Sequence, residues 1–239
     1  MVGKEGLSKL KKVYVKKICD VDKFKVWFVD GEYIRTKIDE EFTNYGQHYR
    51  FSFIPKNEFW IDTERSLGEE RYYIDSMLMM HRLLAKGVPH DEAVCRADVM
   101  EKSERAKGVV LAKGIGDMPR EELLKKVRIK QIKKYCNKRV SVWIVDGELV
   151  RSLFFLDFTE GGHDKVYKFV PEGEVWIDND VSLSERKFVL LHELHERNLM
   201  AKGMCYDDAH RDSSRVEFFC RHNPVKLDGE IIRELRLEK

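Results

Sequence analysis

The sequence Val-Trp-Phe-Val-Asp-Gly-Glu at positions 26–32 recurs as Val-Trp-Ile-Val-Asp-Gly-Glu at positions 142–148. The similarity continues without a gap, so that residues 26–101 pair with residues 142–217, and 27 of the 76 paired positions are identical. The chain is therefore a tandem duplication. Each copy is an internal control for the other, because residues kept in both indicate the framework, while residues present in one copy indicate a special role.

The repeated sequence also predicts the first strands of each copy. Its apolar run ends in Asp-Gly, a strong hairpin signal, so we expect strands on both sides of Asp30-Gly31 and of Asp146-Gly147. Further strands are expected around proline-containing turns, at residues 49–54 with 58–61 and at residues 166–170 with 174–177.

Two helices are expected after these strands. The first begins after a capping box at Ser66 or Ser182 and ends at Gly87 or Gly203, where glycine tolerates a left-handed conformation. The second begins near Asp91 or Asp207. The predicted fold class is α+β, a tandem duplication in which each copy is a small antiparallel β-sheet followed by a helical hairpin.

The copies are expected to be separate domains. We assign residues 1–106 to the first repeat, residues 107–118 to a glycine-containing linker and residues 119–239 to the second repeat. Residues 109–111 of the linker are apolar and should be partly buried. We therefore expect the repeats to pack together as an intramolecular pseudo-dimer.

Composition limits the class of protein. No apolar run approaches the roughly 20 residues that span a membrane, and no signal peptide is recognisable, so we expect a soluble, cytoplasmic protein. Five cysteines without a CxxC pair favour reduced thiols. The 36% of charged residues and the scarcity of glutamine resemble thermophile compositions. The net charge of +2 does not favour nucleic acid as a partner, although lysines cluster near the start of each copy.

The candidate site lies in the second copy alone. Opposite Gln47, Ser76, Met79, Met80 and Val94 of the first copy stand His163, His192, His195, Glu196 and His210. Three of these histidine and glutamate residues, at positions 192, 195 and 196, share one stripe of a helix, where the first copy has ordinary core residues. Burying such groups without partners costs several kcal/mol, and a divalent metal is the simplest compensation.

The remaining candidates would complete this site. His210, on the following helix, completes the ligand set, and His163 is either a fourth ligand or a hydrogen-bond donor to the substrate. Glu217 matches Glu101 of the first copy, so it is expected to be structural and to bond to His210. Zinc is the first choice of metal, and iron or manganese is also open.

The sequence His192-Glu-Leu-His-Glu196 resembles the HExxH helix of the zincin metallopeptidases. The resemblance covers residues 192–210 and implies that His192 and His210 are metal ligands and that Glu193 is the general base. It departs from the family at Glu196, where zincins have histidine. No family is indicated for the whole chain.

Two functions follow from these observations. The first is a metal-dependent, peptidase-like hydrolase with its active site in the second copy and a degenerate first copy as support. The second is a non-enzymatic module that binds nucleic acid or protein and uses the His/Glu cluster structurally. An open coordination position favours the enzyme, and a closed site with four protein ligands favours the module.

Overall fold

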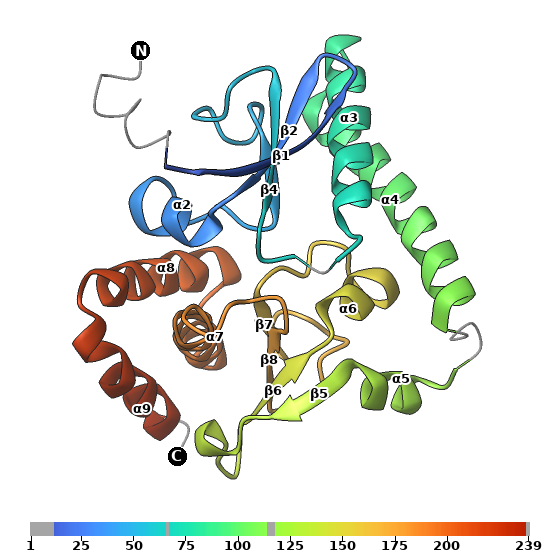
Figure 1. The fold of residues 1–239 in the computed structure, drawn as a ribbon. Coiled ribbons are helices and arrows are strands. Elements are labelled where there is room, and N and C mark those ends of the chain that lie inside the picture. The colour runs from blue at the N-terminus through green and yellow to red at the C-terminus, as the bar shows by residue number, and fades with distance from the viewer. Residues whose placement is uncertain (1–11, 66, 114–117, 238–239) are drawn as a thin grey trace. The chain divides into compact units, whose positions relative to one another are not determined.

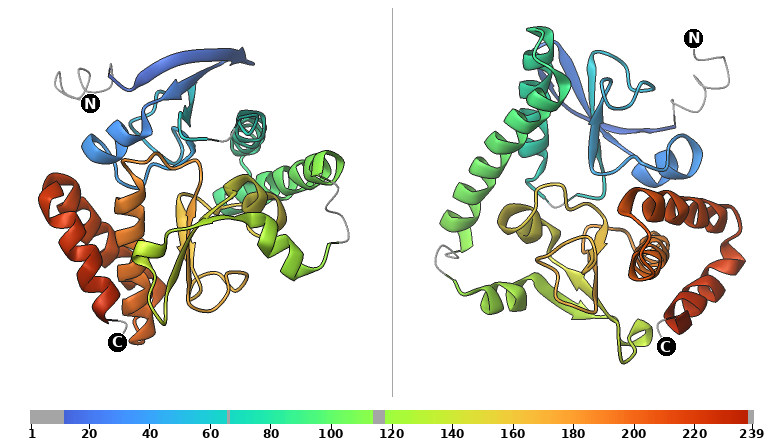
Figure 2. Two further views of the ribbon diagram at one scale, coloured as in Figure 1. Left: turned by 60° about the horizontal axis from the view of Figure 1, so that its bottom comes forward. Right: turned by 180° about the vertical axis from the view of Figure 1, so that it is seen from behind.

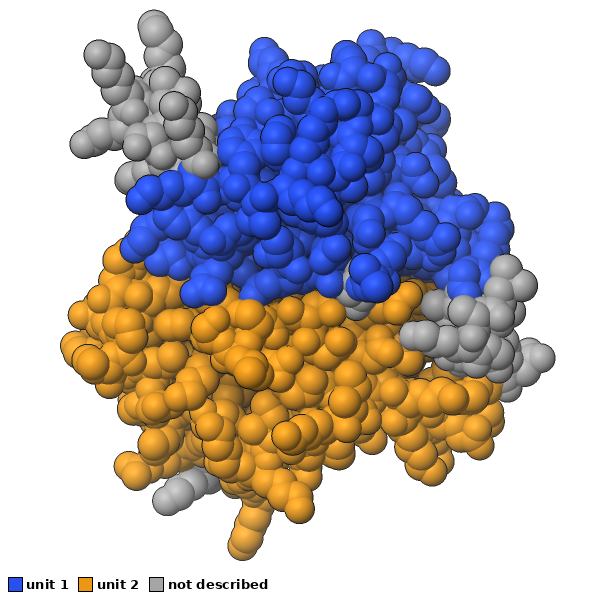
Figure 3. Space-filling model, in the orientation of Figure 1, with its two compact units in different colours: residues 1–116 blue, residues 117–239 orange. Residues whose placement is uncertain are grey.

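The computed structural model describes residues 12–65, 67–113 and 118–237, with the side chains of 109–113 excepted. The chain divides into two compact units, unit 1 (residues 1–116) and unit 2 (residues 117–239), which are coloured separately in Figure 3.

Each unit contains a four-stranded sheet of the same topology (Figure 1). In unit 1 the order is β1 (Tyr14–Val21), β2 (Phe24–Val29), β4 (Glu58–Asp62) and β3 (Tyr45–Gln47). In unit 2 it is β5 (Arg128–Gln131), β6 (Ser141–Val145), β8 (Glu174–Asp178) and β7 (Gly161–His163).

The strand register confirms the duplication. Val26 lies opposite Phe59 in unit 1, and Val142 lies opposite Val175 in unit 2. The α+β class is confirmed as well, but the sheets are mixed rather than antiparallel, since β2 runs parallel to β4 and β6 runs parallel to β8. A parallel pair requires a crossover connection, which contains a short helix in each unit.

The Asp-Gly dipeptides begin these short helices, so the hairpin prediction was wrong. Asp146 is the N-cap of α6 (Gly147–Leu153) and accepts a hydrogen bond from Leu149 N at 2.9 Å. A Cβ at Gly147 would collide with the carboxylate of Asp178 on β8. Glycine is thus required for close approach. The same arrangement in unit 1 joins α2 (Gly31–Lys37) to Asp62.

The strands predicted at residues 49–54 and 166–170 were also wrong. Both segments are turns, although the strands that follow them, β4 and β8, occur as predicted. The apolar residues in the first segment are buried for another reason: Phe51 and Ile54 pack into a core cluster with Phe42 and Trp60. An apolar run in a covering loop therefore had the pattern of a strand.

The helical hairpins are confirmed in both units. They comprise α3 (Glu70–Ala85) with α4 (His90–Lys113), and α7 (Arg186–Ala201) with α8 (Tyr206–His222). Gly87 and Gly203 follow the first helix of each pair with φ of 80° and 94°. Glycine adopts this conformation without steric cost.

Helix α4 continues through Gly108 to Lys113, so residues 107–113 are helical and not an extended linker. A glycine inside a helix lowers the stability of the helix by about 1 kcal/mol relative to alanine, and a helix of this length can form in spite of that cost. The expected capping serine Ser66 and the side chains of residues 109–111 lie outside the described residues.

Unit 2 has further elements. They are α5 (Arg120–Val127), the 3₁₀ turns η1 (Lys133–Tyr135) and η2 (Pro224–Lys226), and α9 (Leu227–Leu237). Helix α7 contacts β7 and β8, and α8 and α9 lie alongside α7 in both views of Figure 2. Among the described residues, no helix combines the length and apolar content needed to cross a membrane.

Each unit contains a buried cluster of charged side chains at matching positions. In unit 1, Arg105 bonds to Glu69 at 2.5 Å and to Glu101 at 2.8 Å. In unit 2, Arg221 bonds in the same way to Glu185 and Glu217, each at 2.7 Å. Conservation of this cluster between the copies assigns it to the framework that joins each helical hairpin. All five cysteines are free.

Candidate metal centre

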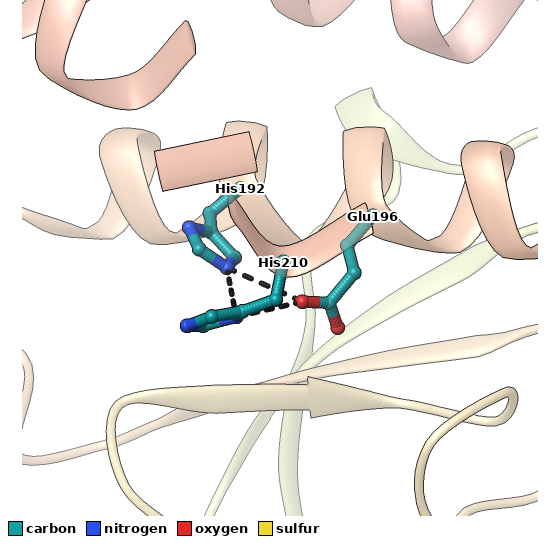
Figure 4. A group of neighbouring side chains, drawn as sticks. All are labelled: His192, Glu196 and His210. Carbon is teal, nitrogen blue, oxygen red and sulfur yellow. Dashed lines mark hydrogen bonds and ion pairs between the residues drawn. The ribbon is translucent and has the colours of Figure 1, made fainter. Parts of the chain in front are cut away.

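Helices α7 and α8 bring three polar side chains to one point in unit 2. His192 and Glu196 lie one turn apart on α7, and His210 reaches them from α8 (Figure 4). His192 Nε2 is 3.1 Å from His210 Nδ1 and 3.5 Å from Glu196 Oε2, and His210 Nδ1 is 2.8 Å from the same oxygen. These atoms form a group able to hold a metal ion.

The distances within this group suit a tetrahedral ion. Ligand atoms bound at about 2.0–2.1 Å to one tetrahedral ion lie about 3.3 Å apart. The three separations, 2.8, 3.1 and 3.5 Å, bracket that value. The group can therefore receive an ion with small side-chain adjustments.

His192 is oriented for ligation by the shared framework. Its Nδ1 donates to Glu217 Oε2 at 2.9 Å, so its Nε2 faces Glu196 and His210. A carboxylate that orients a histidine in this way is the usual second partner of a metal ligand. Glu217 was expected to bond to His210, and this expectation was wrong, because the shared Arg221 holds Glu217 beside α7.

His163 belongs to a second group that could hold a metal ion, with Glu193 and Glu196, so its role as a ligand stays a prediction. Its ring is fully buried, and its Nδ1 accepts a hydrogen bond from Lys165 N at 3.1 Å. The ring proton of the neutral imidazole must then lie on Nε2, which donates to Glu196 Oε1 at 3.0 Å. In this arrangement the Nε2–H of His163 positions Glu196.

His195 lies away from the centre. Its Nε2 is 3.1 Å from Asp212 of α8, and its Nδ1 is 3.0 Å from Glu234 of α9. Because successive residues of a helix are rotated by about 100°, His195 points away from the side of α7 that carries His192 and Glu196, and it points towards α9. The prediction that His195 belongs to the metal set was wrong, since α9 has no counterpart in the repeat and supplies its partner.

Glu193 is the unusual member of the site. It replaces Met77, a core residue that is only 1% exposed in unit 1. Among the described residues, no hydrogen bond or ion pair reaches its carboxylate. A carboxylate oxygen of Glu193 nevertheless lies within 4.8 Å of ligand atoms of His163 and Glu196. An acid without a protein partner thus stands beside the three converging ligands.

The electrostatics separate the three acids of the site. Burial and then the charge of Glu196 raise the pKa of Glu193 to about 8. Burial opposes ionisation of Glu196, but hydrogen bonds from His163, His192 and His210 outweigh it and lower its pKa. Glu217 is held near a pKa of 2, because bonds and charges from His192 and Arg221 outweigh its burial. Two acids are therefore anionic, and one is poised near neutrality.

The charge on His192 follows from its two acidic neighbours. Burial alone would lower its pKa, but hydrogen bonds to Glu196 and Glu217 raise it well above 6.5. A metal would replace the proton on Nε2, so metal affinity should fall in acid.

Three further residues beside the centre were missed by the sequence analysis. Burial and the negative charge of Glu193 raise the pKa of Tyr167, which places its phenol near that acid. The Tyr206 ring stacks on His210 with centroids 5.4 Å apart. A Cβ at Gly161 would lie 3.2 Å from Glu193 Cγ. The twins of these residues are Phe51, His90 and Tyr45, so a complete comparison of the copies would have found them.

Searches of protein-family models, curated proteins and solved structures found no match to this chain.

Proposed function

We propose that unit 2 is a metal-dependent, peptidase-like hydrolase whose divalent cation is held by His192, Glu196 and His210. The observation that carries this proposal is Glu193. A structural zinc site is usually closed by four protein ligands, whereas here three ligands converge and Glu193 adds an acid without a hydrogen-bonding protein partner, at a position where unit 1 has buried methionine. Glu193 is only partly buried, and an acid that stands beside three converging ligands is a candidate for chemistry.

The donor set favours zinc. Two imidazoles and one carboxylate are the ligands of several catalytic zinc sites, and three protein ligands leave a position for water or substrate. Iron and manganese accept the same donors. Because His163 Nε2 carries a proton, it does not close the fourth position.

The side chains have separate tasks in this proposal. A cation held by His192, Glu196 and His210 would polarise the scissile carbonyl and would lower the pKa of a water molecule towards about 7. Glu193 accepts the proton of the attacking water and passes it to the leaving amine. Glu217 orients His192, and His163 orients Glu196. The neutral phenol of Tyr167 is a donor for the oxyanion of the substrate.

The alternative is a binding module in which the cluster is a hydrogen-bonded core network. One observation favours it: His163, Glu196, His192 and Glu217 contact one another in an unbroken chain of hydrogen bonds and ion pairs. Glu193 does not bond to that network, and the alternative gives no reason for an acid at this position.

The deciding experiment combines metal content with peptide hydrolysis. Untagged protein should contain about one equivalent of zinc, iron or manganese per chain. It should also cleave members of a fluorogenic peptide library. Glu193→Gln should keep the metal and lose activity by at least about 100-fold, whereas His192→Ala should lose both.

Glu172→Gln is the matched control, because Glu172 is an exposed glutamate of the same unit. It should behave as the wild type. Full activity of Glu193→Gln would exclude the general-base role, and protein purified without any bound transition metal that also fails to bind added zinc would exclude the metal centre.

A further inference from the structure

Unit 1 contains a hollow that has no part in the proposed hydrolase. Its volume is about 440 Å³, and it lies among the β1–β2 turn, the loop between β3 and β4, and helix α3. The charged and aromatic side chains that line it include Lys23, His48, Tyr49, Lys56, Glu58 and His81. This volume is within the range of small-molecule sites.

Positive charge is in excess in this wall. Among the lining residues, Lys23 and Lys56 are accompanied by one acid, Glu58, whose Oε2 accepts hydrogen bonds from Tyr14 at 2.9 Å and Trp60 at 2.8 Å. Glu174, its twin, bonds to Trp176 in the same way, so the glutamate belongs to the common framework. The positive charges of Lys23 and Lys56 can therefore attract an anion.

The rest of the wall is aromatic. The ring of His81 lies between Phe24, at 4.6 Å, and Tyr49, at 5.5 Å between centroids. Tyr49 is 48% exposed, so part of its ring can contact a ligand. His48 donates its Nδ1 hydrogen to Ile54 O at 2.8 Å, which leaves Nε2 to contact a ligand. A planar group can pack among these rings.

Unit 2 has an ion pair at the corresponding positions. Asp164 and Arg197 replace His48 and His81, and they bond to each other at 2.6 Å. Asp164 also accepts from Gly173 N at 3.0 Å, and Glu172 replaces Lys56. The same framework therefore carries an ion pair in unit 2 and a positively charged hollow at the matching place in unit 1.

We propose that this hollow binds a small organic anion, with its carboxylate or phosphate group held by Lys23 and Lys56 and its planar body packed against Tyr49 and His81. The proposal is independent of the metal centre, because every residue that it uses lies in unit 1.

Titrations of the full chain with phenyl phosphate, benzoate, inorganic phosphate and benzylamine test the proposal, with amide NMR shifts as the signal and constant ionic strength. We expect saturable shifts of unit 1 amides with one or both aromatic anions, at Kd values of about 1 mM or below. Binding of phenyl phosphate alone identifies a phosphate ester, and binding of benzoate alone identifies a carboxylic acid. Benzylamine should not bind. Inorganic phosphate should bind more weakly, since it lacks the ring.

Two variants and a control make the test specific. Lys23→Ala/Lys56→Ala should weaken binding by about tenfold or more. His48→Asp/His81→Arg introduces the ion pair of unit 2 and should abolish binding in a folded protein. The control Lys16→Ala/Lys37→Ala removes the same charge from exposed positions outside the hollow and should leave Kd unchanged.

Three results would overturn the proposal. They are the absence of saturable shifts with either aromatic anion up to about 10 mM, equal weakening by the Lys16/Lys37 control, and undiminished binding in the folded His48/His81 variant.

Discussion

Glu217 accepts the Nδ1 hydrogen of His192 from the position at which Glu101 of unit 1 faces Ser76. In both units an arginine one turn further along the helix holds the glutamate. The second copy therefore has a histidine beside a glutamate that an arginine holds in the same way in both copies. If His192 is a metal ligand as proposed, the framework common to both copies supplies the carboxylate that orients it.

This relationship predicts the effect of Glu217→Gln. The variant should bind zinc about 10–100-fold more weakly, because the amide is a weaker acceptor for His192 Nδ1–H. Competition with a chromophoric chelator measures the affinity. Glu101→Gln makes the same change in the framework of unit 1 and should leave zinc affinity unchanged. Equal loss in both variants would show that Glu217 has a structural role only.

Glu193 should make the metal-free protein sensitive to base. Its pKa is raised from 4.5 to about 8, so its stabilising contribution is present below pH 4.5 and is lost as the pH rises through 8. A shifted group changes stability by up to roughly 1.4 kcal/mol per pH unit. Metal-free Glu193→Gln should therefore be more stable than the wild type at pH 8. Parallel urea midpoints of the two proteins from pH 5 to pH 8 would contradict this expectation.

His195 should stabilise the docking of α9 in a pH-dependent way. Hydrogen bonding to Glu234 raises its pKa above 6.5, burial opposes the shift, and Asp212 adds to it. The ion pairs are fully present below pH 6.5 and are lost as the pH rises through the raised value. His195→Met introduces the residue of unit 1 and should remove this dependence without changing zinc affinity. Loss of zinc binding would return His195 to the metal set.

The sequence predicted the site better than it predicted the sheet. Comparison of the copies selected five donors at positions 163, 192, 195, 196 and 210, and three of them, His192, Glu196 and His210, converge in the structure. It did not separate ligands from their partners. The role of His163 depends on which ring nitrogen carries its proton, and that depends on Lys165 N, a contact made by the fold. His195 was misplaced because its acidic partner on α9 lies outside the repeat.

The strand errors have a physical cause of their own. Asp-Gly favours a hairpin when no tertiary contact competes, but here Asp146 caps a helix and Gly147 makes room for Asp178. Local preference was overridden by packing across the sheet. Both copies share these residues, so the internal control could not reveal the error.

Gly147→Ala tests this explanation. The added methyl would collide with the Asp178 carboxylate, and we expect a loss of about 2–4 kcal/mol. Gly229→Ala is the matched control, because its Cβ would meet no atom within 4 Å on helix α9. It should be neutral or stabilising by up to about 1 kcal/mol. Thermal unfolding of both variants decides the matter, and an unchanged midpoint for Gly147→Ala would refute the close-approach role.

Conversion of the whole centre to its twin is the strictest test of function against stability. The variant carries five changes, each to the residue of unit 1: His163→Gln, His192→Ser, Glu193→Met, Glu196→Met and His210→Val. Unit 1 shows that this framework accepts those residues, with Met77 buried and Gln47 Nε2 3.5 Å from Met77 O. The variant should fold, bind no zinc and hydrolyse no peptide.

Its stability separates the two functions. If the polar cluster is kept for chemistry, an apolar core should raise the free energy of unfolding of the metal-free protein by about 1–4 kcal/mol. If the cluster is a structural network, its removal should lower that energy instead. Urea unfolding of the metal-free wild type and the variant at pH 7 measures the sign, and circular dichroism verifies the fold. A folded but less stable variant would favour the binding module over the hydrolase.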